Sequence, residues 1–81
     1  MAVKVQTITG GSNHANVQNL RGWSVRGTVV LRLRRATVGG QILASTTNAS
    51  HELFPEPIDA QGGTFVEVVS GSLDDGVLYY V

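Results

Sequence analysis

The sequence contains no cysteine and few aromatic residues: one tryptophan, two tyrosines and two phenylalanines among 81 residues. Without cysteine the chain can form neither disulfide bonds nor thiolate metal sites, which support many small domains. With so few rings, the hydrophobic core has to consist of valine, leucine and isoleucine, which bury less area per residue. A chain of this length holds one core. We therefore expect a single domain over residues 1–81 that gains stability from oligomerisation or from docking on a larger assembly.

Long apolar segments are absent as well. The opening segment, MAVKVQTITGG, lacks the apolar run of a signal peptide, and no stretch approaches the roughly 20 apolar residues that cross a membrane. These absences predict synthesis in the cytoplasm and no membrane partner.

The chain also lacks helical periodicity, because no segment places apolar residues at helical spacing between a capping residue and a final glycine. Alternation of apolar and polar residues, which is typical of half-buried strands, recurs instead and is clearest in residues 28–35. We expect an all-β fold: a single antiparallel sandwich, jelly-roll or immunoglobulin-like, or a barrel, with about seven short strands. The expected strands cover residues 3–9, 17–26, 28–35, 41–46, 52–54, 64–70 and 76–81.

Glycine and proline mark the expected turns. The pair Gly39 and Gly40 predicts a two-residue hairpin between antiparallel strands at about residues 29–38 and 41–46, because such turns need positive φ angles. Gly22, inside an apolar stretch, indicates a bulge or a close approach of another backbone. The other expected loops and turns cover residues 10–16, 55–63 and 72–76.

The charged residues are divided between the two parts of the chain, since all six basic residues precede residue 36 and all six acidic ones follow residue 51. One interpretation places the two parts in partner strands, where exposed Arg and Glu pairs each contribute under about 1 kcal/mol. Another places a basic and an acidic patch on different sides of the domain, so that copies join plus to minus and separate at high salt. Nucleic-acid binding through Arg32, Arg34 and Arg35 is disfavoured by the zero net charge and by the lack of aromatic residues among these arginines.

Catalytic and metal-binding patterns are weak. His14 and His51 stand alone, outside any frame such as G-x-S-x-G and without the close spacing of zinc ligands. Glu52, Glu56 and Glu67 could supply paired carboxylates, but a domain of this size hardly builds the cleft that such chemistry needs. We therefore expect no enzymatic activity, no catalytic residue, no bound metal and no cofactor.

Most of the chain resembles a known class of proteins. The order of VVLRLR, a Gly-Gly turn into QILAST, the proline-containing PIDAQGG and a final TFVEVVSGSLDDGVLYYV looks like the small all-β proteins of bacteriophage virions, over about residues 20–81. The resemblance implies a structural component of the virion, either a capsid decoration or cement protein or an accessory protein of the head fibre, knob or tail. It implies no catalytic residue. Residues 1–19 lie outside the resemblance and are a candidate for an extended N-terminal arm.

The residues and the resemblance together predict a virion protein that binds a major capsid or tail protein as a homo-oligomer, with a trimer favoured, and stabilises the particle. The residues expected at its interfaces are Val3, Val5, Arg32, Arg34, Leu78 and Tyr80. The alternative is a ligand-binding β-sandwich that recognises a glycan or receptor through residues 12–16 and 46–51. An exposed aromatic platform would favour that alternative, whereas buried rings would favour the structural role, and we expect Trp23 to be a half-buried core residue.

Overall fold

A computed structural model describes residues 2–81 of the protein. It confirms the all-β prediction, because about 70% of the residues lie in strands and no described residue lies in a helix. Accordingly, these residues include no helix that is long and apolar enough to cross a membrane. The strands are β1 (Lys4–Thr7), β2 (Asn13–His14), β3 (Asn19–Arg35), β4 (Ile42–Thr47), β5 (Ser50–Asp59) and β6 (Thr64–Tyr80).

The six strands form one antiparallel sheet. β3 and β6, each of 17 residues, pair along almost their whole length and make its centre. Along the other side of β3, β5 pairs with the first part and β4 with the second. Along the other side of β6, β2 pairs with the first part and β1 with the last. One edge of the sheet is therefore made by β4 and β5, and the opposite edge by β1 and β2.

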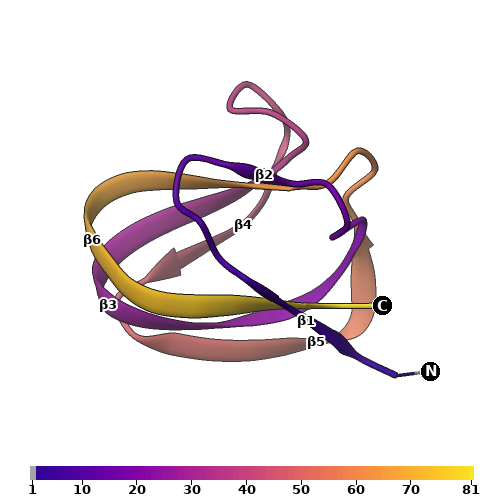
Figure 1. Ribbon diagram of the computed structural model, residues 1–81, viewed down its shortest axis with the longest axis horizontal. Helices are drawn as coiled ribbons and strands as arrows, with labels where there is room; N and C mark the ends of the chain where they lie inside the picture. The colour runs from indigo at the N-terminus through magenta and orange to yellow at the C-terminus, as the bar shows by residue number, and fades with distance from the viewer. Residues whose placement is uncertain (1) are drawn as a thin grey trace.

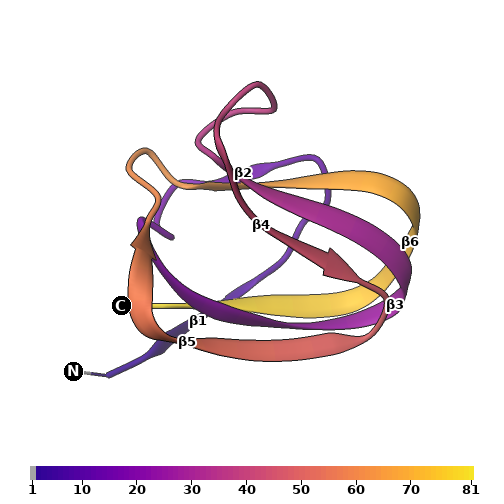
Figure 2. The same ribbon diagram turned by 180° about the vertical axis from the view of Figure 1, so that it is seen from behind.

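The two central strands bend together near their middle. Gly27 in β3 and Gly71 in β6 have positive φ angles of 130° and 80°, and the pairing register shifts beside Gly27. A Cβ at Gly71 would overlap the carbonyl oxygen of Thr28, so this close approach of the two strands requires glycine. Figures 1 and 2 show both ribbons turning back on themselves at the bend. The single sheet is thereby folded into two layers.

We call the two layers the β4 half and the β5 half. The β4 half consists of β2, β4, residues 30–35 of β3 and residues 64–70 of β6. The β5 half consists of β1, β5, residues 19–25 of β3 and residues 76–80 of β6. In Figure 1 the β4 half lies above the β5 half, and the bend is at the left. The fold is thus a sandwich-like arrangement built from one continuous sheet.

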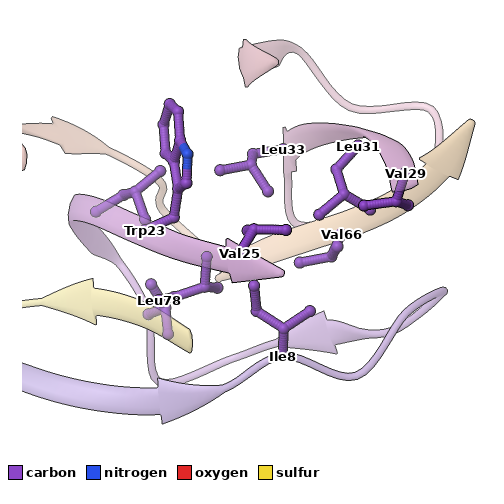
Figure 3. Packing of buried hydrophobic residues seen from close by; sticks show 10 residues of the cluster. Ile8, Trp23, Val25, Val29, Leu31, Leu33, Val66 and Leu78 are labelled. Atoms are coloured by element: carbon purple, nitrogen blue, oxygen red, sulfur yellow. The ribbon is translucent and has the colours of Figure 1, made fainter. Parts of the chain in front are cut away.

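The core lies between the two halves, where buried side chains from both meet in a single cluster (Figure 3). Its members are Ile8, Val17, Leu20, Trp23, Val25, Val29, Leu31, Leu33, Val66 and Leu78. Valine, leucine and isoleucine supply all but one of them, in line with the composition. The exception, Trp23, is only 4% exposed and packs edge to face on Phe54, with ring centroids 5.3 Å apart. Trp23 is therefore a core residue.

Four of the expected short strands are joined into the two long ones. Residues 17–26 and 28–35 largely belong to β3, and residues 64–70 and 76–81 largely belong to β6. The turn predicted at residues 72–76 is wrong, because these residues continue β6 through the bend, paired with β3. The alternation of apolar and polar residues located the strands correctly. The glycines at the bend, however, are the same residues that usually mark the end of a strand in a sequence. The structure consequently has six strands, two of them long, and not about seven short ones.

β5 runs through both prolines, so the loop predicted at residues 55–63 is wrong over its first part. Pro55 and Pro57 lie between Leu53 and Ile58, where β5 does not pair with β3. β5 is also an edge strand, so the missing N–H donor of a proline leaves no neighbouring strand without a hydrogen bond. The prolines therefore bend the edge of the sheet without ending the strand.

The antiparallel pairing of β3 with β4 is confirmed, but the two-residue turn is wrong. Residues 36–41 connect the two strands, and the positive φ angle falls on Ala36, at 63°, and not on Gly39 or Gly40. The amide of Gly40 donates to the carbonyl oxygen of Thr37 at 2.9 Å, which closes a turn inside the longer loop. Glycine pairs in a sequence thus mark this connection but not its length.

Residues 2–19 are part of the folded domain. Ile8, His14 and Val17 are buried, and β1 and β2 both pair with β6 of the same chain. The arm predicted over residues 1–19 is therefore wrong for the described residues, and Met1 lies outside them. The last part of β6 is paired on both sides, by β1 and β3, so it offers no open strand edge to a neighbour.

Candidate interaction surface

The outer surface of the β5 half carries no charged residue in its paired rows, and the nearest charge on β3 is Arg21, the bulge residue next to Gly22. Side chains that face away from the core line up in two rows across β1, β6, β3 and β5. The first row is Val5, Tyr79, Gly22 and Leu53, and the second is Thr7, Val77, Ser24 and His51. We call these residues the uncharged face. Val5 and Leu53 are 57% and 52% exposed, so apolar surface meets solvent on both edge strands.

Alternation along β3 sets the orientation of this face. Trp23 and Val25 point into the core, so Gly22 and Ser24 face outward. A Cβ at Gly22 would overlap the carbonyl oxygen of Glu52 on the neighbouring strand, so glycine is required there. The predicted bulge or close approach at Gly22 is confirmed, because the register of β3 shifts between residues 20 and 22.

Tyr79 and His51 meet at the centre of the uncharged face. Their rings pack edge to face, with centroids 5.9 Å apart and an interplanar angle of 78°. Tyr79 is also the direct partner of Gly22, an arrangement in which an aromatic ring covers backbone that glycine leaves bare. A pair of rings, the half-buried Tyr79 and the exposed His51, thus stands where charged side chains usually solvate the outer surface of a sheet.

An open hollow of about 400 Å³ adjoins the second row, where the sheet begins to bend. Its lining residues are Thr7, Ser24, Arg26, Asp75, Gly76 and Val77. Arg26 Nε and Asp75 Oδ1 are 3.9 Å apart, and the two side chains are 79% and 68% exposed. Because these two charges have opposite signs, the border of the uncharged face at the hollow has no net charge.

The outer surface of the β4 half is charged. Arg34 donates from Nε to Glu67 Oε1 at 2.9 Å and from Nη1 to the carbonyl oxygen of Gly40 at 3.0 Å. The Arg34 and Glu67 side chains are only 17% and 27% exposed, so this pair is partly shielded from solvent. Arg32 is the direct strand partner of Glu67 but forms no ion pair among residues 2–81. This surface therefore presents one free guanidinium beside a satisfied ion pair.

The separation of charge along the sequence is largely cancelled in the fold. β3 carries five of the six basic residues and lies between β6 and β5, which carry the acidic ones. Ion pairs join Arg26 with Asp75, Arg34 with Glu67, and Arg35 with Asp59. This arrangement agrees with the interpretation in which oppositely charged strands are partners, and it leaves no side of the domain wholly basic or wholly acidic.

Three of the residues predicted at an interface are accessible to a partner. Val3 and Val5 are 45% and 57% exposed, on β1 or just before it. Arg32 is half-buried on the outer surface of the β4 half. Arg34 lies on the same surface but is already held by Glu67 and Gly40. The predicted set is thus divided between two surfaces and does not form one patch.

The two residues predicted on the last strand face inward. Leu78 is 0% exposed and belongs to the core, so its side chain cannot contact a partner. Tyr80 is half-buried, and its hydroxyl accepts a hydrogen bond from Asn16 Nδ2 at 2.9 Å. The residues that alternate with them, Val77 and Tyr79, face outward in the uncharged face. The structure therefore places Leu78 and Tyr80 on the inner side of the last strand and Val77 and Tyr79 on its outer side.

The aromatic residues do not form an exposed platform in the described chain. Trp23 is buried and donates from Nε1 to Ser50 Oγ at 3.0 Å, and both tyrosines are half-buried. The loops proposed for glycan recognition, residues 12–16 and 46–51, lie on opposite edges of the sheet, since β2 pairs with β6 whereas β4 and β5 pair with β3. The structure therefore does not assemble the ligand site that the sequence left open.

The histidines contact other parts of the fold. His14 is buried, accepts a hydrogen bond at Nε2 from the amide of Thr9 at 2.9 Å, and donates from Nδ1 to the carbonyl oxygen of Thr64 at 3.1 Å. These two bonds need a neutral ring with its proton on Nδ1, and they fasten the start of the chain to β6. No group of three His, Cys, Asp or Glu side chains in residues 2–81 is placed to hold a metal ion.

Sequence reasoning missed most of the uncharged face, including Leu53, Tyr79 and Val77. The sequence offers one weak signal. The outward positions of β1 and of the last part of β6, which alternate with inward ones, carry no charged residue. The strands β1 and β5 are separated by 42 residues of chain, and no local sequence pattern shows that they contribute to the same surface. A comparison with protein-family models, curated proteins and solved structures yields no match for this chain.

Proposed function

We propose that this protein is a non-enzymatic structural subunit of a bacteriophage virion, which binds the capsid or tail as a homo-oligomer and stabilises the particle. The uncharged face is the observation that carries the proposal. It spans four strands with no Lys, Arg, Asp or Glu in either row, and the two edge positions of its first row, Val5 and Leu53, are more than half exposed. Exposed apolar side chains on a surface whose paired rows carry no charge support a protein-binding role.

The burial of the aromatic rings also supports a structural role. Recognition of glycans relies on exposed aromatic faces, whereas Trp23 packs on Phe54 inside the core. The hollow beside Arg26 is wide open to solvent, so it resembles an uneven protein-binding surface more than an enclosing ligand pocket. Binding to a large, repetitive particle would in turn stabilise a domain that has one modest core and no disulfide.

Purified particles provide the test. Virions from a strain that carries the gene would be banded on a caesium chloride gradient and compared with virions from a strain in which the gene is deleted. We expect the chain to band with the wild-type particles in a fixed ratio to the major capsid or tail protein. Particles that lack the chain should release their DNA at a lower temperature. Added purified protein should restore the wild-type release temperature, because a protein that binds the intact particle and not the disrupted one stabilises the intact form.

Two results would contradict this function. One is a chain found only in the unbound fraction of the lysate, with deletion particles that match the wild type in DNA-release temperature. The other concerns a Val5→Lys, Leu53→Lys double variant that no longer associates with particles or with itself. If this variant still restored the DNA-release temperature of the deletion particles, stabilisation would not depend on binding. If the chain does band with the particles, electron microscopy of a tagged chain would show whether it binds the head or the tail.

A further inference from the structure

Arg21 occupies a bulge of β3 beside the uncharged face. The register of β3 shifts between Leu20 and Gly22 against both neighbouring strands, so Arg21 has no strand partner on β5 or on β6. Leu20 and Trp23 are 0% and 4% exposed and point into the core, which leaves Arg21 and Gly22 as the outward positions between them. The half-buried Arg21 therefore lies next to the first row of the uncharged face.

The guanidinium of Arg21 has no acceptor within residues 2–81. It takes part in no ion pair and in no side-chain hydrogen bond of this part of the chain. Its Nε is fully covered by protein and still has no hydrogen-bond partner. The Nε of Arg35 is covered too, but Arg35 donates from Nη2 to the carbonyl oxygen of Asp59 at 3.0 Å. Arg21 thus combines partial burial with five unmet donors, a state that calls for an acceptor from outside the chain.

The covered Nε determines how such an acceptor approaches. A ligand reaches the guanidinium from the end formed by Nη1 and Nη2, where two N–H groups match the two oxygens of a carboxylate. The phosphates of a nucleic acid need several free cations in a line, but Arg26, the other arginine of this surface, already faces Asp75 at 3.9 Å. One carboxylate is therefore the acceptor that Arg21 fits.

The neighbours of Arg21 select what carries this carboxylate. Gly22 pairs with Tyr79 on one side and with Leu53 on the other, and Leu53 is 52% exposed. A small free ion would leave this apolar surface in contact with water. An acidic side chain that stands between apolar ones would satisfy Arg21 and cover the first row at the same time.

We propose that Arg21 and the first row of the uncharged face bind a protein segment that presents one Asp or Glu between apolar side chains. The proposal rests on the function proposed above, in which a particle protein carries this segment, and it names the chemistry of that partner. Arg21 supplies the charge that selects the segment, and the row supplies the apolar contact.

Nuclear magnetic resonance of the 8.6 kDa chain tests the proposal on the isolated protein. The probe is the peptide acetyl-Ser-Leu-Asp-Leu-Ser-amide, and the comparison peptide has Asn in place of Asp. We expect the Asp peptide to shift the Arg21 Nε–H signal and the amides of Gly22, Leu53 and Tyr79, with a Kd on the order of 1–10 mM. The Asn peptide should bind at least about tenfold more weakly, because it lacks the charge-assisted pair.

Matched variants separate this site from a general effect of charge. Arg21→Gln should raise the Kd of the Asp peptide at least about tenfold. Arg32→Gln should leave it unchanged, because Arg32 is also half-buried and without an ion pair in the described chain but lies on the β4 half. Arg21→Lys should have an intermediate effect, because lysine keeps the charge and loses the planar pair of donors. Leu53→Ala should weaken both peptides, and the spectra themselves verify that each variant is folded.

Several results would overturn the proposal. Equal binding of the two peptides, equal effects of Arg21→Gln and Arg32→Gln, or tighter binding of inorganic phosphate than of the Asp peptide would each do so. Glu56 lies on the segment of β5 opposite Arg21, so tighter peptide binding by Glu56→Gln would show that the chain supplies its own acceptor. A dimer of the free chain that Arg21→Gln abolishes would make a second copy the partner, against the proposal.

Particle binding distinguishes this failure from that of the proposed function. The virion role predicts that Arg21→Gln lowers the amount of chain bound to deletion particles and that Arg32→Gln does not. Unchanged particle binding by Arg21→Gln would reject the site and keep the virion role. Binding of the Asp peptide at Arg21, in a protein that virions lack, would keep the site and reject the virion role.

Discussion

The β4 half and the β5 half share one core but present different outer surfaces. Inside, both contribute leucine and valine to a single cluster. Outside, the β4 half carries Arg32 and the partly shielded pair of Arg34 and Glu67, whereas the paired rows of the β5 half carry no charge at all. Charged side chains keep a surface solvated, so the two outer surfaces differ in how strongly they hold water.

The difference also shows that composition alone does not locate an interface. The β5 half does contain charges outside its two paired rows: Lys4 on β1, Arg21 at the bulge of β3, and Glu52, Glu56 and Asp59 on the edge strand β5. β5 thus combines prolines and carboxylates on its free edge, two devices that discourage strand-to-strand aggregation. The same half therefore protects its edge while leaving its outer surface open for packing.

The largest expected effect tests the shared core. Leu31→Ala in the β4 half and Leu78→Ala in the β5 half each remove a fully buried side chain, so each should lower the free energy of unfolding by about 2–5 kcal/mol. Because both leucines belong to one cluster, urea unfolding should remain a single transition in both variants. Two separate transitions would show that the halves are independent units, and the comparison of their surfaces would then concern two small domains.

Much of the fold follows from the sequence, because alternation is a local property. The pattern of Val29, Leu31 and Leu33 locates the inward side of β3 without knowledge of its partners. The expected strands therefore lie close to the observed ones, including the pairing of β3 with β4. What alternation cannot distinguish is a strand end from a bend, since Gly27 and Gly71 serve as bulges within strands that continue.

The candidate site could not be predicted for a different reason. Its rows combine residues from β1, β3, β5 and β6, and their register depends on pairing between distant segments. A shift of one residue exchanges the two sides of a strand, so the sequence alone does not show that Val77 and Tyr79 face outward while Leu78 and Tyr80 face inward. Only the pairing of Tyr79 with Val5 and Gly22 reveals that these residues share a surface.

The next largest effect concerns the bend that separates the halves. Gly71→Ala would place a side chain at a φ angle of 80° and against the carbonyl oxygen of Thr28, so we expect a loss of about 1–3 kcal/mol in unfolding free energy. Gly39→Ala is the matched control, because a Cβ there meets nothing within 4 Å and the φ angle is not positive. Equal stability of the two variants in urea would mean that the bend does not depend on Gly71.

The smallest effect compares an ion pair from each surface. Arg34→Met removes the 2.9 Å bond to Glu67 in a setting that is mostly shielded, and should cost about 1–2 kcal/mol because a partly buried carboxylate loses its partner. Arg26→Met removes a 3.9 Å contact between largely exposed side chains, and should change stability by less than about 0.5 kcal/mol. Methionine keeps the apolar stem in both cases, so urea unfolding at low and high salt isolates the charge. A cost for Arg26→Met as large as that for Arg34→Met would mean that the border of the uncharged face is held by its own ion pair.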